Sequence, residues 1–312
     1  MISDTAITIG AQESDPDKLR EKEHSVTTIN DPEFWREQWN TLNAATGGFS
    51  GYGSAATWDA MAPQYGRRHD DGAMDERCAA TLDLLGKKGV EFEGAAVLDI
   101  GCGPGKYAAA FARRGARVVA VDISAAMLDR LRTETEPGEL RSITTVQADW
   151  KMLDVDAAGY AGAFDLVFAN MTPAVATAGS FEKLMRVSRL WCWFRGWAGV
   201  RKNPLQERLY RAVHGKEQRP FSGNFICALN LVCALGRYPD CSFEPIGRSE
   251  KKTVDEWADF YALFFSGGIA EKQKAIRSLL EEALRETAVD GSVENTVTGH
   301  TGGMLWSVND NV

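Results

Sequence analysis

Short apolar runs alternate with helix-like segments between residues 95 and 195. The runs are rich in Val, Ile and Phe, and several are apolar at consecutive positions, which is typical of strands buried on both faces of a parallel sheet. Segments at helical spacing separate them, as in repeated βαβ units. This pattern predicts five strands, at residues 97–100, 117–122, 143–148, 164–170 and 190–195.

Helical spacing dominates the rest of the chain. Asp31, Pro32 and Glu33 mark a helix start, and a second helix begins near Ala56. Residues 1–28 are polar and charged without apolar periodicity, which favours a flexible arm. Further helices are expected at residues 180–187, 203–213, 225–235, 254–265 and 271–286, and short strands at 242–247 and 303–308, with Gly302 and Gly303 near the turn before the second.

The first strand runs into a turn with glycine at alternate positions, Gly101, Gly103 and Gly105. Glycine permits positive φ and lets a flat ligand approach the backbone without a Cβ in the way. The second strand ends in Asp122, where nucleotide-binding folds bind ribose hydroxyls. The turn and this carboxylate together predict a nucleoside-cofactor site.

The turn argues against a dinucleotide. The dinucleotide fingerprint is G-x-G-x-x-G, whereas here Lys106 stands in place of the last glycine and Pro104 removes a backbone donor from a phosphate cradle. Asp99, two residues before the first glycine, suits a ligand that carries positive charge.

The stretch Asp99-Ile100-Gly101-Cys102-Gly103-Pro104-Gly105, followed by Asp122, resembles the first motifs of the class I S-adenosylmethionine-dependent methyltransferases. The resemblance covers about residues 95–195. It implies a doubly wound α/β fold, the Rossmann-like methyltransferase fold, with a mostly parallel seven-stranded sheet whose antiparallel strand lies at the edge. It also implies an N-terminal helical lid over residues 29–72 and a core over 73–312 with a helical lid insertion at about 200–290.

The resemblance also implies S-adenosylmethionine as cofactor, S-adenosylhomocysteine as product and in-line methyl transfer. Asp149 would accept a hydrogen bond from the adenine amino group, and Trp150 would pack on the ring. The expected cofactor-binding residues are Asp99, Gly101, Cys102, Gly103, Gly105, Asp122, Ile123, Met127, Asp149, Trp150 and Asn170.

Each assignment has a plainer alternative. Asp99 and Asp122 can cap nearby backbone amides, and Asn170 can satisfy the turn before Thr172 and Pro173. Acid–Trp pairs such as Asp149-Trp150 also occur at strand ends that bind nothing.

Tyr65, Asn170 and Arg195 are the expected catalytic residues. Arg195 ends the fifth strand at the ligand edge, where a guanidinium needs a partner, either an anionic substrate group or a lid carboxylate. Trp35 and Trp58 are expected near the methyl group, whereas His69 is expected to be solvated. The aromatic residues of the fifth strand, Trp191, Trp193 and Phe194, are expected in the core.

The chain has 312 residues, 44% of them hydrophobic, and a formal net charge of −8. An acidic surface argues against nucleic acid as the main partner. No apolar run is long enough to span a bilayer, no signal peptide is evident, and the cysteines and histidines show no metal-ligand spacing. We therefore expect a cytoplasmic protein without a metal, of undetermined oligomeric state.

Three classes of function remain. A methyltransferase with a small-molecule acceptor is favoured by the acidic surface and the aromatic-rich lid. A methyltransferase that acts on protein or RNA is the second class; Asn170-Met171-Thr172-Pro173 has only part of the motif of amino-methylating enzymes. A cofactor-binding scaffold or an NAD-dependent oxidoreductase is the third. The sequence does not identify the acceptor atom or a general base.

Overall fold

The computed structural model describes residues 28–45, 52–63, 65, 72–218 and 221–309. The strands are β1 (Ala96–Ile100), β2 (Arg117–Asp122), β3 (Ile143–Gln147), β4 (Phe164–Asn170), β5 (Ser188–Trp197), β6 (Val200–Arg201), β7 (Phe221–Ser222), β8 (Asp240–Thr253) and β9 (Ser292–Ser307). The helices are α2 (Pro32–Ala45), α3 (Ala55–Met61), α4 (Ala73–Lys87), α5 (Lys106–Arg113), α6 (Ala125–Glu134), α7 (Pro137–Leu140), α8 (Ala178–Val187), α9 (Pro204–His214), α10 (Phe225–Ala234), α11 (Val254–Ser266) and α12 (Ala270–Arg285). The expected flexible arm and His69 lie outside the described residues, apart from residue 28.

Seven strands form one sheet in the order β3-β2-β1-β4-β5-β9-β8. The strands β1 to β5 are parallel, and β9 runs antiparallel to both of its neighbours, β5 and β8. The expected α/β fold with a mostly parallel seven-stranded sheet is confirmed. The expected edge position of the antiparallel strand is wrong, because β8 forms the edge. The inner half of β9 is buried residue after residue whereas β8 is mostly exposed, so β9 suits the interior position.

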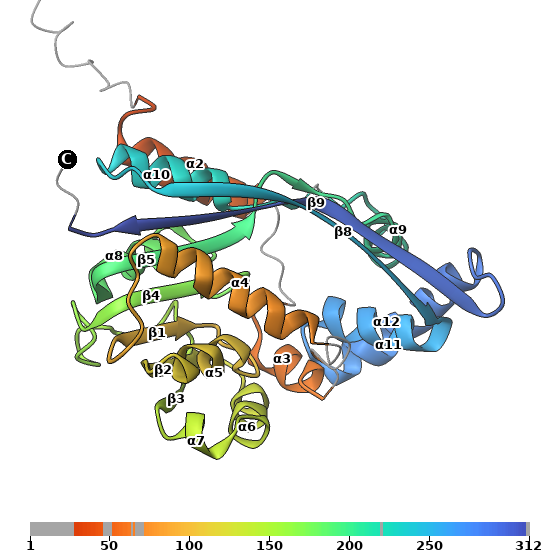
Figure 1. Ribbon diagram of the computed structural model, residues 1–312. Helices are drawn as coiled ribbons and strands as arrows, with labels where there is room; N and C mark the ends of the chain where they lie inside the picture. The colour runs from red at the N-terminus through yellow and green to blue at the C-terminus, as the bar shows by residue number, and fades with distance from the viewer. Residues whose placement is uncertain (1–27, 46–51, 64, 66–71, 219–220, 310–312) are drawn as a thin grey trace, which may run out of the picture.

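Helices cover both faces of the sheet (Figure 1). One face packs against α4 and α5 through a cluster that includes Leu82, Phe111 and Trp193. The other face packs against α2, α8 and α10 through a cluster that includes Phe181 and Phe194. The alternation along β5 is therefore as expected, although Trp191 is only partly buried.

Most of the expected helices are present with bounds shifted by a few residues. The helix α4 was not expected, although Cys78, Leu82 and Leu85 lie at helical spacing and are fully buried. Two helices from the expected lid regions, α2 and α10, pack against each other on the core of the sheet instead of beyond its edge.

β8 and β9 form a ribbon far longer than the two short strands expected. Residues 301–307 of β9 pair with β5, and the ribbon continues past that point to the pair Thr253 and Ser292. Figure 1 shows it reaching away from the sheet and carrying α11 and α12 at its far end. The outer part of β8 is polar and exposed, so no apolar run marked it in the sequence.

Gly302 and Gly303 lie inside β9, not in a turn before it. A Cβ on Gly302 would lie 2.3 Å from Phe225 Cε1, and one on Gly303 would lie 2.8 Å from Trp193 Cη2. These glycines leave room for aromatic rings on the two faces of the sheet.

The outer ribbon, α9, α11 and α12 enclose a separate apolar cluster. It includes Leu209, Trp257, Tyr261, Leu280 and Leu284, all at most 2% exposed. We call this part, residues 200–214 and 246–299, the outer module. It has its own core, joined to the sheet by the β8–β9 ribbon.

Candidate active site

The glycine turn connects β1 to α5. Gly101, Gly103 and Gly105 have φ of 67°, 54° and 79°, in the left-handed region that disfavours other residues. A Cβ on Gly101 would lie 1.9 Å from Thr172 Oγ1, and one on Gly105 would lie 2.3 Å from Leu131 Cγ. At Gly103 the nearest atom would be Tyr65 Cε1, at 3.9 Å. The middle of the turn therefore presents bare backbone to a space beside Tyr65.

Asp99 is buried beneath this turn, at 3% exposure. Its Oδ2 has no hydrogen-bond partner among the described residues. Burial, and secondarily the nearby Asp122 carboxylate, raise the pKa of Asp99 to about 7, although a hydrogen bond from the Ala108 amide opposes the shift. A buried acceptor without a donor is costly, so Asp99 is suited to a cationic or N–H-bearing ligand.

Asp122 ends β2 on the other side of the turn. Its Oδ2 accepts a hydrogen bond from the Gly103 amide at 2.9 Å, and its Oδ1 accepts one from the Ser124 amide at 2.9 Å. The side chain of Ser124 is the cap of α6, so Asp122 is not needed for that role. Asp122 is only 9% exposed. Burial raises its pKa, and these backbone hydrogen bonds oppose the shift.

These residues fit an S-adenosyl cofactor. The bare backbone at Gly103 would accept a flat ligand, and the unpartnered Asp99 oxygen would accept an N–H from it. Ile123 follows Asp122 and is half-buried; Cys102 lies within the turn and donates from Sγ to the Gly103 carbonyl. Ile123 and Cys102 as cofactor contacts stay predictions.

The expected adenine residues lie just after β3. Asp149 is half-buried, and its Oδ1 accepts a hydrogen bond from the Lys151 amide at 2.9 Å. Trp150 is 1% exposed, and its indole N–H donates to the Ser180 carbonyl at 2.9 Å. This burial favours a core role for Trp150 over ring stacking. Met127 is buried to the same degree.

Asn170 and Arg195 lie opposite each other at the carboxyl ends of β4 and β5. Asn170 Oδ1 accepts a hydrogen bond from the Trp193 indole at 3.2 Å, so the amide links two strands instead of completing a turn. Arg195 forms an ion pair with Glu244 on β8 and donates to Thr301 Oγ1 at 3.0 Å. Of the two partners expected for Arg195, the structure contains the carboxylate of the late insertion.

Tyr65 is brought to the glycine turn by the segment that follows α3. Its ring contacts Trp58 edge-on, with centroids 5.8 Å apart. Desolvation of the phenol raises the pKa of Tyr65, even though the residue as a whole is partly exposed. Trp35, by contrast, lies on α2 and packs against the core cluster of α8 and α10.

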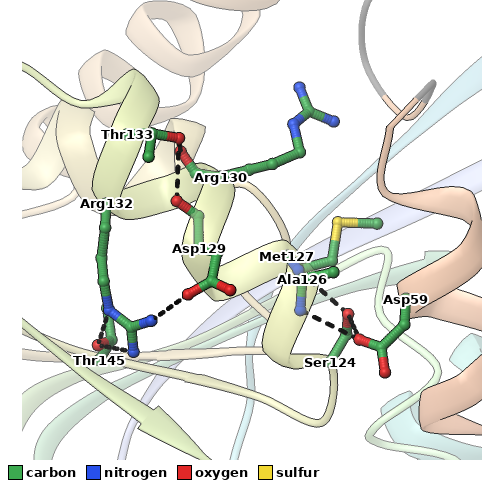
Figure 2. Close-up of polar contacts among 9 residues, drawn as sticks. All are labelled: Asp59, Ser124, Ala126, Met127, Asp129, Arg130, Arg132, Thr133 and Thr145. Carbon is green, nitrogen blue, oxygen red and sulfur yellow. Dashed lines mark hydrogen bonds and ion pairs between the residues drawn. The ribbon is translucent and has the colours of Figure 1, made fainter.

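Asp59 docks α3 onto the start of α6 (Figure 2). Its Oδ1 accepts hydrogen bonds from Ser124 Oγ at 2.6 Å and from the Ala126 amide at 3.1 Å. A carboxylate at a helix N-terminus is stabilised by the helix dipole. Arg130 of α6 donates to the carbonyls of Ala62 and Tyr65, so α6 fixes the end of this segment too.

Neither contact was expected from the sequence, because Asp59 and Ser124 are 65 positions apart and an acid inside a short helix carries no signal of its own.

Within the described residues, no three His, Cys, Asp or Glu side chains come together as metal ligands would. No helix in the described part of the chain combines the length and apolar character needed to cross a membrane.

A family model described as a methyltransferase domain matches residues 97–189. Trans-aconitate 2-methyltransferase from Azoarcus sp. (strain BH72) is 39% identical over 98 residues, which is 31% of this chain and 34% of that protein. An uncharacterized protein from Haemophilus influenzae is 46% identical over 55 residues, 18% of this chain and 20% of that protein. The chain thus matches about a third or less of the length of these curated relatives.

Solved structures are similar only at a coarse level. A Bacillus halodurans protein proposed to be a methyltransferase has a TM-score of 0.45 and 16% identity, covering 73% of this chain and 99% of its own. Magnesium protoporphyrin IX methyltransferase from Synechocystis, with bound S-adenosylhomocysteine, has a TM-score of 0.40 and 15% identity, covering 73% and 83%. Both TM-scores lie below 0.5.

An open α/β sheet with a glycine turn after its first strand and carboxylates at the following strand ends is a nucleoside-binding fold. Residues 97–189 match a methyltransferase-domain family model. S-adenosylmethionine is the nucleoside cofactor of the class I methyltransferases that the glycine turn and Asp122 resemble.

Proposed function

We propose that the protein transfers a methyl group from S-adenosylmethionine to a small-molecule nucleophile. The observation that carries this proposal is the pair of buried carboxylates, Asp99 and Asp122, on either side of a glycine turn whose middle, Gly103, faces Tyr65. The acidic chain and the methyltransferase-domain match support it, as does the acceptor in the name of the Azoarcus relative, trans-aconitate, which is a small molecule.

When bound, S-adenosylmethionine supplies a sulfonium-activated methyl group. Asp122 would hold the ribose hydroxyls, and the free oxygen of Asp99 would accept an N–H of the ligand. Tyr65, held over Gly103, would exclude water from the reacting end and position the acceptor. Proximity and alignment then account for most of the rate, so a strong base is not required when the nucleophile is a thiolate or neutral amine.

The proposal includes a cytoplasmic location. It is favoured by the cysteines, all six of which are free thiols, since disulfides are rare in reducing compartments.

Calorimetry on the full chain tests cofactor choice. We expect S-adenosylmethionine and S-adenosylhomocysteine to bind, and NAD to bind more weakly than either. Tighter binding of NAD would overturn the proposal.

A second experiment tests the acceptor class. The chain is incubated with a metabolite extract and cofactor labelled in the methyl group, and the products are analysed by mass spectrometry. We expect label in a small molecule. Label found only in protein or RNA would make the macromolecular alternative correct.

A further inference from the structure

The outer module encloses a cavity of about 60 Å³ between the β8–β9 ribbon, the start of α9, and α11. A water molecule needs roughly 10–15 Å³ of such space, so the cavity has room for several waters or a small organic molecule. Its polar lining includes Tyr52, Arg201, Asn203, Arg248, Glu250 and Asn295. None of these residues belongs to the glycine turn or to the strand ends described above.

Positive charge exceeds negative charge around this cavity. Two guanidinium groups, of Arg201 and Arg248, line it together with one carboxylate, of Glu250. The Glu250 carboxylate forms an ion pair with Lys252 Nζ at 3.3 Å, so a third cation lies beside the same carboxylate. Arg248 has no carboxylate within ion-pair distance in the described part of the chain. In a chain with a net charge of −8, this local excess of positive charge, with Arg201 and Lys252 buried and Arg248 exposed, favours binding of an anion.

Arg201 is the deeper of the two arginines, at 8% exposure. One of its nitrogens donates to the neutral amide oxygen of Gln206 at 3.1 Å, and its guanidinium lies 5.6 Å from the centroid of the Trp197 ring. The Gln206 amide and the Trp197 ring thus help to orient the Arg201 guanidinium, a planar group suited to bidentate binding of a carboxylate.

Asn295 supplies a second, independent sign of a ligand. It is 6% exposed, and its Nδ2 donates to the Tyr261 hydroxyl at 3.3 Å. Its Oδ1 is buried without a hydrogen-bond partner in the described residues. Buried acceptors are rarely left without a donor, so an O–H or N–H of a bound molecule would complete this wall of the cavity.

A series of aromatic contacts links the cavity to the glycine turn. Phe264, on the cavity wall, contacts Tyr52 with centroids 4.6 Å apart. Tyr52 stacks on Trp58 at 5.7 Å, and Trp58 contacts Tyr65 at 5.8 Å. Tyr65 in turn lies beside Gly103. The rings of Tyr52, Trp58 and Tyr65 therefore lie between the cavity and the cofactor turn.

We propose that this cavity binds a small organic acid through Arg248 and Arg201, with Asn295 accepting a hydrogen bond from it, at a site separate from the cofactor turn. The binding of a carboxylate here does not depend on the proposed function.

The test uses the full chain and calorimetry with succinate, citrate and benzoate, each compared with its neutral amide, in the presence and absence of S-adenosylhomocysteine. At least one acid is expected to bind more tightly than its amide. Arg248→Gln should weaken that binding about tenfold or more, as expected for loss of a charge-assisted hydrogen bond. Arg248 is exposed, so this variant is expected to fold.

Lys251→Gln is the matched control. It removes the same charge from the same strand, but side chains alternate along β8, so Lys251 lies on the face opposite Arg248. It should change acid binding less than about twofold. Both variants should keep their affinity for S-adenosylhomocysteine.

Three results would overturn the cavity assignment: no acid binds, the amides bind as well as the acids, or the two variants behave alike. These outcomes are distinct from failure of the proposed function, which would appear as absent binding of S-adenosylhomocysteine to the unmodified chain.

Discussion

Asp99 and Asp122 place two carboxyl groups beside one glycine turn, each within reach of the other's charge. Burial and the charge of Asp122 raise the pKa of Asp99 to about 7, from an ordinary value of 3.8. The folded chain therefore binds a proton at Asp99 over a pH range in which the unfolded chain does not. The stability contributed by this proton is complete below about pH 4 and is lost as the pH rises through 7.

Asp99→Asn should remove this pH dependence. Without cofactor, the variant should melt at a higher temperature than the unmodified chain at pH 8, with a smaller difference at pH 5, because Asn cannot ionise. Its affinity for S-adenosylhomocysteine should fall about tenfold, since the free carboxylate oxygen is lost. Thermal melts at both pH values, with calorimetry, provide the measurement.

Asp83→Asn, at an exposed ion pair on α4, controls for simple loss of a surface carboxylate. A melting difference between Asp99→Asn and the unmodified chain that did not grow from pH 5 to pH 8 would contradict the burial argument.

The helix α3 is short, and its position depends on contacts with α6. Asp59 accepts two hydrogen bonds at the start of α6, and that helix also holds the chain after α3 near Tyr65. Loss of the Asp59 contact, which Figure 2 shows, should leave the core intact. It should loosen the segment that ends with Tyr65 beside Gly103.

Asp59→Ala should therefore weaken binding of S-adenosylhomocysteine about three- to tenfold, mainly through faster dissociation. Stopped-flow or surface-plasmon measurement of the dissociation rate provides the readout. Asp129→Ala, which removes an exposed carboxylate from α6 itself, is the control and should have little effect. Equal rates in the two variants would show that Asp59 does not control access to the turn.

The sequence predicted β2 and β4 with the bounds that the structure shows. Strands buried on both faces need continuous apolar runs, and such runs are visible in a single sequence. The outer halves of β8 and β9 were missed because a two-stranded ribbon with an exposed face needs no such run. Contacts between distant positions, such as Asp59 with Ser124, depend on the fold and leave no local pattern.

Some site residues could likewise be predicted from the sequence, and others could not. The glycine turn was predictable because positive φ at Gly101, Gly103 and Gly105 demands one residue type. Trp150 was expected to stack on a ring, but a large aromatic residue after a strand also suits the core, and here its indole is buried against Ser180. The chain positions of Arg248 and Asn295 gave no reason to bring them to one cavity.

The apolar clusters of the sheet and the separate cluster of the outer module are joined by a ribbon and should respond separately to damage. Trp257 is 2% exposed in the core of the outer module, and its indole N–H donates to the Val293 carbonyl. Trp257→Ala should lower the stability of that module by about 3–5 kcal/mol. Hydrogen exchange should quicken across residues 254–293 and stay slow in β1, β2 and β4, while S-adenosylhomocysteine still binds.

Trp193→Ala is the matched variant in the other core, where the indole is 3% exposed and stacks on Phe168. It should destabilise the sheet itself by a similar amount, about 3–5 kcal/mol, and weaken cofactor binding. Uniformly faster exchange in both variants would show that the two cores unfold as one.

In the outer ribbon, side chains at successive positions of a strand point to opposite faces. Arg248 and Glu250 face the cavity because they are an even number of positions apart along β8, and Asn295 and Val297 are related in the same way on β9. A single inserted or deleted residue in either strand would exchange the two faces beyond that point and turn the cavity's arginine outward. Length changes in this ribbon are therefore tolerable only in steps of two, matched on both strands. Substitutions do not shift the pairing of the two strands. The side chains that line the cavity can therefore change while the glycine turn and its carboxylates stay as they are.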